Sequence, residues 1–300
     1  NYKNLEIIIS DNASTDKTFL ICDEFLKKDK RIKYYRSEEN LGSSWNFNHV
    51  FKLSSGKYFM WAAHDDIRHP SFVRLCVEKM EQSPKAVLCQ AYTQMFIEGR
   101  QEVLCVSNLD SFDGITGSIS QYRETLRHFP AVAIYGLYRS SAMQKTRMFE
   151  PVIATDLAFI QELSIYGNFV QVPEILFSYI GRKKWNTVHQ DYKVFLGKNK
   201  KPWWYIPFIA LFCNHWSRVT SSKVSFNIKL CLWWALIEWQ LFQVAQKIII
   251  KTCKRVCPAS WKNKLANVLY TQWMRGPNLQ IKCKDLFFER IIKPKMGWWS

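Results

Sequence analysis

Carboxylates directly follow two short apolar segments near the start of this 300-residue chain. The first segment ends in Asp11, within the run Ser-Asp-Asn-Ala-Ser-Thr-Asp, and the second ends in Asp65 and Asp66. Carboxylates and small hydroxyls at the carboxyl ends of buried strands are where open α/β sheets hold nucleotides. The two groups therefore indicate one site for a charged ligand, a nucleotide diphosphate with a metal.

The elements that would position these carboxylates alternate between strand and helix. Strand patterns lie at 5–10, 32–36, 58–62, 86–91, 133–139 and 169–172, and helical patterns at 15–28, from about 43 to 53, at 70–82 and at 156–166. Pro70 is placed in the first turn of its helix, where its missing N–H costs nothing. This β-α-β-α order predicts an α/β layer architecture.

The same residues resemble a known family. The strand ending in Asp11, the run Asn40-Leu41-Gly42 followed by Asn46-Phe47-Asn48, and the Asp-Asp pair followed by Pro70 are together similar to family 2 glycosyltransferases. The resemblance extends from residue 1 to about 195. It implies a GT-A-like, Rossmann-type, mostly parallel sheet flanked by helices, and an inverting enzyme that uses a nucleotide-sugar. The family's first strand and helix have no counterpart here, so we expect an N-terminally truncated catalytic domain.

The resemblance assigns Asp11 to the nucleotide base. In the family, the corresponding carboxylate accepts a hydrogen bond from the base, typically from uracil N3–H, which favours UDP- or dTDP-sugars. The alternative is that Asp11 and Asp16 only cap the following helix, since Asp is a preferred capping residue. For Asp16 we favour capping.

The resemblance assigns Asp65 to a divalent metal, Mg²⁺ or Mn²⁺, and Asp66 to the diphosphate. The chemistry requires such a cation because the leaving nucleoside diphosphate develops negative charge, and hard cations prefer carboxylate oxygen. This chain departs from the family pattern at Ala63 and His64, where many members carry another Asp. This departure is expected either to weaken metal binding or to shift the preference toward Mn²⁺, since an imidazole suits softer ions. The alternative is that the Asp pair caps the helix entered at Pro70.

Asp156 is the candidate catalytic base by the same resemblance. An inverting enzyme needs a carboxylate to deprotonate the acceptor hydroxyl, and a helix N-terminus favours the charged form. Simple N-capping is the alternative role for Asp156. Arg182 lies where family members have a basic loop over the diphosphate, so it is a candidate phosphate contact, and a solvated basic loop is the alternative.

The last hundred residues differ sharply from the rest in composition. Residues 201–300 contain 16 Lys and Arg against 3 Asp and Glu, and 10 of the 13 Trp. We therefore divide the chain into a catalytic domain at 1–197 and a helical region at 198–300. Trp, Lys and Arg beside an apolar helix at 227–250 are typical of an interfacial anchor, which anionic cytoplasmic lipids would attract. The alternative is a helical domain that packs its Trp inward.

These observations predict a glycosyltransferase that moves a sugar to a hydroxyl of a lipid-linked or cell-surface glycan. We expect it in the cytoplasm, at the inner face of the cell membrane. Charge and aromatic residues also suit single-stranded nucleic acid, but no nucleic-acid-binding motif accompanies them, so no nucleic-acid partner is expected. A membrane-associated, non-catalytic nucleotide-binding homologue and a nucleotidyltransferase remain the alternative functions.

Overall fold

The structure is a computed structural model that describes residues 2–97, 103, 105–107, 109, 112, 114–128, 131–181 and 206–256. Its strands are β1 (Ile7–Asp11), β2 (Ile32–Arg36), β3 (Tyr58–Phe59), β4 (Ile67–Arg68), β5 (Ala86–Ile97), β6 (Cys105–Ser107), β7 (Leu137–Arg139) and β8 (Asn168–Gly181). Its helices are α1 (Thr18–Lys28), α2 (Ser43–Lys52), α3 (Phe72–Glu81), α4 (Ser118–Arg127), the 3₁₀ helix η2 (Ala131–Tyr135), α5 (Ser140–Met143), α6 (Thr155–Leu163), α8 (Pro207–Ser221) and α9 (Phe226–Val256).

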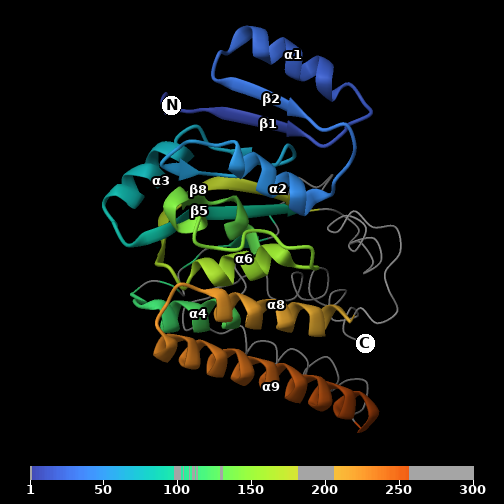
Figure 1. The fold of residues 1–300 in the computed structure, drawn as a ribbon, viewed down its shortest axis with the longest axis vertical. Helices are drawn as coiled ribbons and strands as arrows, with labels where there is room; N and C mark the ends of the chain where they lie inside the picture. The colour runs from blue at the N-terminus through green and yellow to red at the C-terminus, as the bar shows by residue number, and fades with distance from the viewer. Residues whose placement is uncertain are drawn as a thin grey trace.

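The strands form two sheets between layers of helices, which confirms the α/β prediction (Figure 1). β1 and β2 pair in parallel, and the larger sheet has the order β3-β7-β5-β8-β4, with β6 added on β5. The long pair β5/β8 is parallel, whereas the short strands β4, β6 and β7 run antiparallel to their neighbours. The larger sheet is therefore mixed, because short returning strands complete it.

Helix α2 attaches the smaller sheet to the rest of the molecule. Ser10 Oγ donates to Asn46 Oδ1 at 2.6 Å, and Asn46 Nδ2 donates back to the Ser10 carbonyl at 3.1 Å. The Glu6 carboxylate accepts hydrogen bonds from the backbone N–H groups of Ser55 at 2.6 Å and Gly56 at 3.1 Å. The Ser-Asp-Asn run and the Asn-Phe-Asn run are thus neighbours in space.

Strand β8 is much longer than the sequence pattern predicts. The predicted strand ends at Val172, before Pro173, but the observed strand continues to Gly181. The pairing register between β5 and β8 shifts at this point, where Ala91 pairs with Val172 and the next residue pairs with Ile175. A bulge of this kind accommodates a proline within a strand, because the unpaired residues need no ladder N–H.

Helix α8 packs against α6, and α9 packs against α4 and α8, on the side of the larger sheet away from β1 (Figure 1). Their contact is an apolar cluster with Tyr122 and Leu126 of α4, Val219 of α8, and Leu232 and Leu236 of α9. In the described ranges, no helix combines the length and the apolar character that crossing a membrane requires. The predicted boundary at 197/198 lies outside the described residues, so the two-domain division stays a prediction.

Candidate functional site

Asp65, predicted to bind the metal, and Asp66, predicted to contact the diphosphate, lie in the turn between β3 and β4. Asp65 is exposed, and Asp66 is partly buried. Asp66 Oδ1 accepts a hydrogen bond from the Ile180 backbone N–H of β8 at 3.2 Å, so this carboxylate faces the sheet and not the start of α3. Ser71 is the N-cap of that helix. Burial raises the pKa of Asp66, and the neighbouring charge of Asp65 adds to the increase.

Tyr135, at the end of η2, lies near enough to three of the predicted carboxylates for their charges to act on its phenol. Burial raises the pKa of its phenol most, and nearby acidic groups raise it further. These groups are Tyr179, Asp66, Asp156 and Asp65. Asp65 and Asp156, which are 91 positions apart in the chain, therefore act electrostatically on one hydroxyl. The structure brings the predicted metal site and the predicted base to the same region.

The ring of Tyr135 is held against β8 by aromatic contacts that no local pattern predicted. Its centroid lies 5.8 Å from that of Phe177 and 6.2 Å from that of Tyr179. The next residue, Gly136, lies close to β5, where a Cβ at that position would be 2.7 Å from the Cys89 carbonyl oxygen. An aromatic residue directly before such a glycine is the one local signal that could have indicated Tyr135.

Arg68 of β4 is the second site residue that sequence reasoning missed. Its guanidinium stacks over Phe177 at 4.7 Å from the ring centroid. It donates to the carbonyl oxygens of Trp61 at 2.8 Å and Tyr135 at 3.4 Å. Arg68 therefore ties the turn that carries Asp66 to the end of η2, and its positive charge partly offsets the effect of burial on Asp66.

Asp156 lies in the first turn of α6. Ala154 is the N-cap of this helix and has a left-handed backbone conformation, with φ of 60°. Thr155 Oγ1 accepts a hydrogen bond from the Glu150 N–H at 2.9 Å, which fixes the entry into the helix. Asp156 is thus not the N-cap, and the helix dipole favours its ionised form at this position.

Asp11 lies on the smaller sheet, where its side chain is fully buried among groups of the protein itself. Its carboxylate accepts hydrogen bonds from the Ser14 N–H at 2.7 Å and the Tyr34 hydroxyl at 2.5 Å, and Arg36 Nε lies 3.8 Å away. Burial raises the pKa of Asp11, but the bonds from Ser14 and Tyr34 and the charge of Arg36 lower it to below its usual value. Asp16, in contrast, accepts from the Thr18 N–H at 2.9 Å, at the start of α1.

Arg182, the predicted phosphate contact, falls outside the described residues. The roles of Asp11, Asp65, Asp66, Arg182 and Asp156 stay predictions.

Residues 1–146 match the family described as Glycosyl transferase family 2. This segment of the chain belongs to glycosyltransferase family 2. The family 2 segment contains Asp11, Asp65, Asp66 and Tyr135, and it ends ten residues before Asp156. The identity predicted from the Ser-Asp-Asn and Asp-Asp runs is therefore confirmed.

Curated proteins that are similar to this chain are also described as glycosyltransferases. An uncharacterized glycosyltransferase of Haemophilus influenzae is 36% identical over 97 residues, which are 32% of this chain and 30% of the relative. An uncharacterized glycosyltransferase of Rickettsia prowazekii is 25% identical over 179 residues, covering 59% of this chain and 53% of the relative. The chain thus spans between about a third and a half of the length of these relatives.

The fold is similar to that of solved GT-A glycosyltransferases. The crystal structure of residues 1–349 of S. aureus TarS superposes with a TM-score of 0.53 at 12% identity, covering 90% of this chain and 71% of that chain. At this identity the similarity concerns the fold alone. It confirms the predicted GT-A-like architecture of this chain.

The Asp pair fits a divalent cation that a ligand would help to coordinate. Across the described part of the chain, no group of three or more His, Cys, Asp or Glu side chains could hold a metal by itself. Within that part, the buried Oδ2 of Asp66 has no hydrogen-bond partner, and Asp65 is exposed beside it. Mg²⁺ typically binds through one or two carboxylates together with substrate phosphates, which is the donor set that this turn offers.

Proposed function

We propose that this chain transfers a sugar from a UDP- or dTDP-sugar to a hydroxyl of a lipid-linked or cell-surface glycan, with inversion at the anomeric carbon. The observation that carries the proposal is the family 2 match of residues 1–146, and the charges of Asp65, Asp66 and Asp156, which all act on Tyr135, support it. The reaction needs a cation to neutralise the leaving diphosphate and a base to deprotonate the acceptor hydroxyl. The pair Asp65 and Asp66 suits the first task, and Asp156 suits the second.

The turn after β3 would bind the diphosphate end of the donor. Asp65 and the free oxygen of Asp66 would hold Mg²⁺ or Mn²⁺, and Arg68 would keep the turn in place. The cation, when bound, would neutralise the charge that develops on the departing nucleoside diphosphate. Arg182 is a further candidate for the phosphates.

Asp156 would act at the other end of the reaction. It would take the proton of the acceptor hydroxyl while that oxygen forms its bond to the anomeric carbon. The bond from that carbon to the diphosphate oxygen breaks in the same displacement, which inverts the configuration. A carboxylate in the first turn of α6 suits this role because the helix dipole keeps it ionised.

The choice of UDP as donor nucleotide draws support from a protein of the same fold. S. aureus TarS has been crystallised with UDP-GlcNAc, and that structure superposes on this chain with a TM-score of 0.52 at 14% identity. Asp11 would read the base in this proposal. Because its side chain is buried, the base N3–H would have to replace the Tyr34 hydroxyl as hydrogen-bond donor to the carboxylate.

A nucleotide-release assay tests the proposed activity. The full chain is incubated with Mn²⁺ and, separately, UDP-GlcNAc, UDP-glucose and a dTDP-sugar, with and without lipid-linked glycan acceptors. We expect free nucleotide from one donor, at a rate that the correct acceptor increases. Tight UDP binding without release from any donor would instead support the non-catalytic homologue. Release of pyrophosphate from a nucleoside triphosphate and a sugar phosphate would support a nucleotidyltransferase.

We also propose that α9 lies on the surface of an anionic membrane. Leu232 and Leu236 are buried on the inward face of this helix, and the opposite face carries an exposed apolar stripe. The stripe consists of Leu230, Trp234, Leu241 and Ile248, which are 47%, 63%, 65% and 60% exposed. At 100° per residue, these four positions fall within 60° of one another. An exposed stripe beside the basic end of a helix is the pattern of an interfacial helix.

Vesicle binding tests this proposal. The full chain is expected to sediment with vesicles that contain an anionic phospholipid, and the double variant Trp234→Glu/Leu241→Glu is expected to bind at least about 10-fold more weakly, since burying one large apolar side chain is worth about 1.5–3 kcal/mol. The buried-face variant Leu232→Ala is the control for general destabilisation. Unchanged vesicle binding by the double variant would contradict the proposal, and loss of a dimer in that variant would indicate a second copy as the occupant.

A further inference from the structure

We infer that Arg218 of α8 is a positioning residue for Asp156, acting through the loop that leads into α6. The inference rests on the proposed role of Asp156 as the base. Helix α8, which follows the segment that matches the family, would therefore help to position the base.

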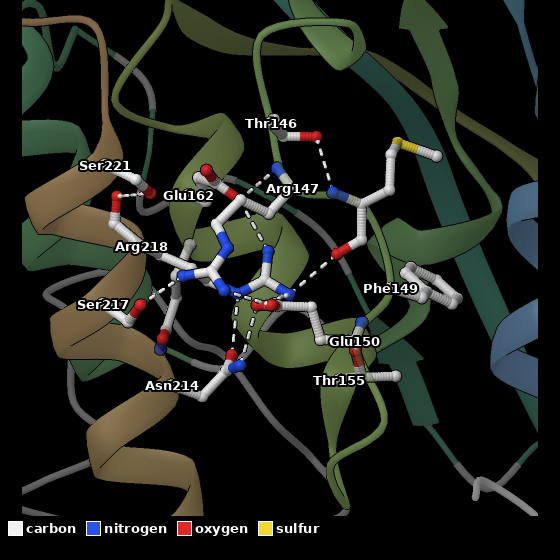
Figure 2. Close-up of polar contacts among 12 residues, drawn as sticks. Thr146, Arg147, Phe149, Glu150, Thr155, Glu162, Asn214, Ser217, Arg218 and Ser221 are labelled. Atoms are coloured by element: carbon white, nitrogen blue, oxygen red, sulfur yellow. Dashed lines mark hydrogen bonds and ion pairs between the residues drawn. The ribbon is translucent and has the colours of Figure 1, made fainter.

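Arg218 is a buried cation whose donors all have acceptors within the protein. The residue is 1% exposed. Its Nε donates to Asn214 Oδ1 at 2.7 Å, Nη1 to Glu162 Oε2 at 2.5 Å, and Nη2 to the Met148 carbonyl at 2.7 Å. Glu150 Oε2 lies 3.2 Å from Nη2. Figure 2 shows the guanidinium extending from α8 between Glu162 and Glu150.

The acceptors of Arg218 bracket the loop before Asp156. Met148 and Glu150 belong to the loop itself, and Glu162 lies in α6. The same Glu162 oxygen also accepts the Arg147 N–H at 3.0 Å. Glu150 in turn donates its N–H to Thr155 Oγ1, the residue directly before Asp156. The Arg218 guanidinium therefore contacts the Met148 carbonyl and the Glu150 side chain of the loop. It also binds the Glu162 carboxylate, which holds the loop to α6.

This loop needs such contacts because two of its residues have unfavourable backbone conformations. Met148 has φ of 53° and Ala154 has φ of 60°, in the left-handed region that costs free energy for residues other than glycine. On the opposite side, Asn48 of α2 holds Phe149, accepting its N–H at 3.0 Å and donating to its carbonyl at 2.8 Å. Arg218 supplies the corresponding contact from α8.

A purely structural anchor for α8 is the competing explanation. Buried ion pairs contribute little net stability compared with well-packed apolar side chains, because desolvation offsets the attraction. Stability alone therefore does not account for a buried arginine, whereas directional bonds to a strained loop do. The two explanations differ in what they predict for the loop when the charge is removed.

Amide hydrogen exchange in the full chain tests the positioning role without any assay of activity. In Arg218→Met, we expect the N–H groups of Arg147 and Glu150 to exchange at least about 10-fold faster, since the local opening free energy governs exchange. The control is Val219→Ala, the neighbouring buried residue of α8, which weakens packing on α9 but leaves the polar contacts of Arg218. Equal exchange at Arg147 and Glu150 in wild type and Arg218→Met would overturn the inference.

Turnover of the double variant Arg218→Met/Glu162→Gln separates positioning from stability. The second change removes the charge of Glu162, which has lost its partner Arg218, so thermal stability should recover. The kcat should stay lower by about 10–100-fold, as expected for a catalytic group misplaced by about 1 Å. The Kd for UDP should change less than about 2-fold, and Arg218→Lys should recover part of kcat. Recovery of both stability and kcat in the double variant would show a merely structural role. If wild type shows no transfer, the proposed function fails, while the exchange experiment still decides the inference.

Discussion

Replacing Asp156 by Asn is expected to lower the rate of glycosyl transfer by about 10²–10⁴-fold, which is the usual contribution of a general base. The amide has almost the same shape as the carboxylate but cannot take a proton from the acceptor hydroxyl. The fold should persist, because Ala154 is the N-cap and the bond from Glu150 to Thr155 sets the start of α6. Loss of a negative charge near the helix N-terminus costs only about 0.3–1 kcal/mol.

The decisive measurement is single-turnover transfer from the active donor, together with the Kd for UDP. We expect Asp156→Asn to keep the wild-type Kd, since the residue would act on the acceptor and not on the nucleotide. Glu78→Gln, which makes the same change at an exposed ion pair of α3, is the matched control and should transfer at the wild-type rate. Full activity of Asp156→Asn would refute the assignment of the base.

Replacing Asp65 by Ala is expected to abolish metal-dependent binding of UDP. Calorimetric titration of UDP into the wild-type chain should give much tighter binding with Mn²⁺ than without it. In Asp65→Ala, the Kd in Mn²⁺ should rise by at least about 100-fold, because even the loss of a group that merely orients a metal ligand costs 10–100-fold in affinity. The titration in buffer without a divalent cation should be the same for both proteins.

The pH dependence of that titration tests the contribution of Asp66. Burial raises the pKa of Asp66. Protons therefore compete with the metal for this carboxylate at a higher pH than they would at an ordinary aspartate. Metal-dependent UDP binding should therefore weaken as the pH falls, and proton release should accompany binding. Glu78→Gln, at the exposed ion pair of α3, is the control and should retain both the metal dependence and the pH dependence. If UDP binds wild type equally well with and without Mn²⁺, this turn is not a metal site.

The local sequence was sufficient for the elements that carry the candidate site. Apolar periodicity located β1, β2, α2, α3 and α6 to within a few residues, since these patterns depend on neighbouring positions. Residue type located the candidate carboxylates, because few side chains can hold a hard cation or take a proton near neutral pH. The Ser-Asp-Asn and Asp-Asp runs also identified the family, as the match of residues 1–146 confirms.

Tertiary structure alone decided which of these residues meet and what holds them. The charges of distant acidic residues act on Tyr135 because β7, β5 and β8 lie side by side in the larger sheet. The buried carboxylate of Asp11 accepts a hydrogen bond from Tyr34, which is 23 residues away in the chain. Arg218 contacts Glu162 across 56 residues, and Asn48 holds Phe149 across 101. Periodicity and residue type describe each segment by itself. Contacts between distant segments arise only when packing selects one pairing among many.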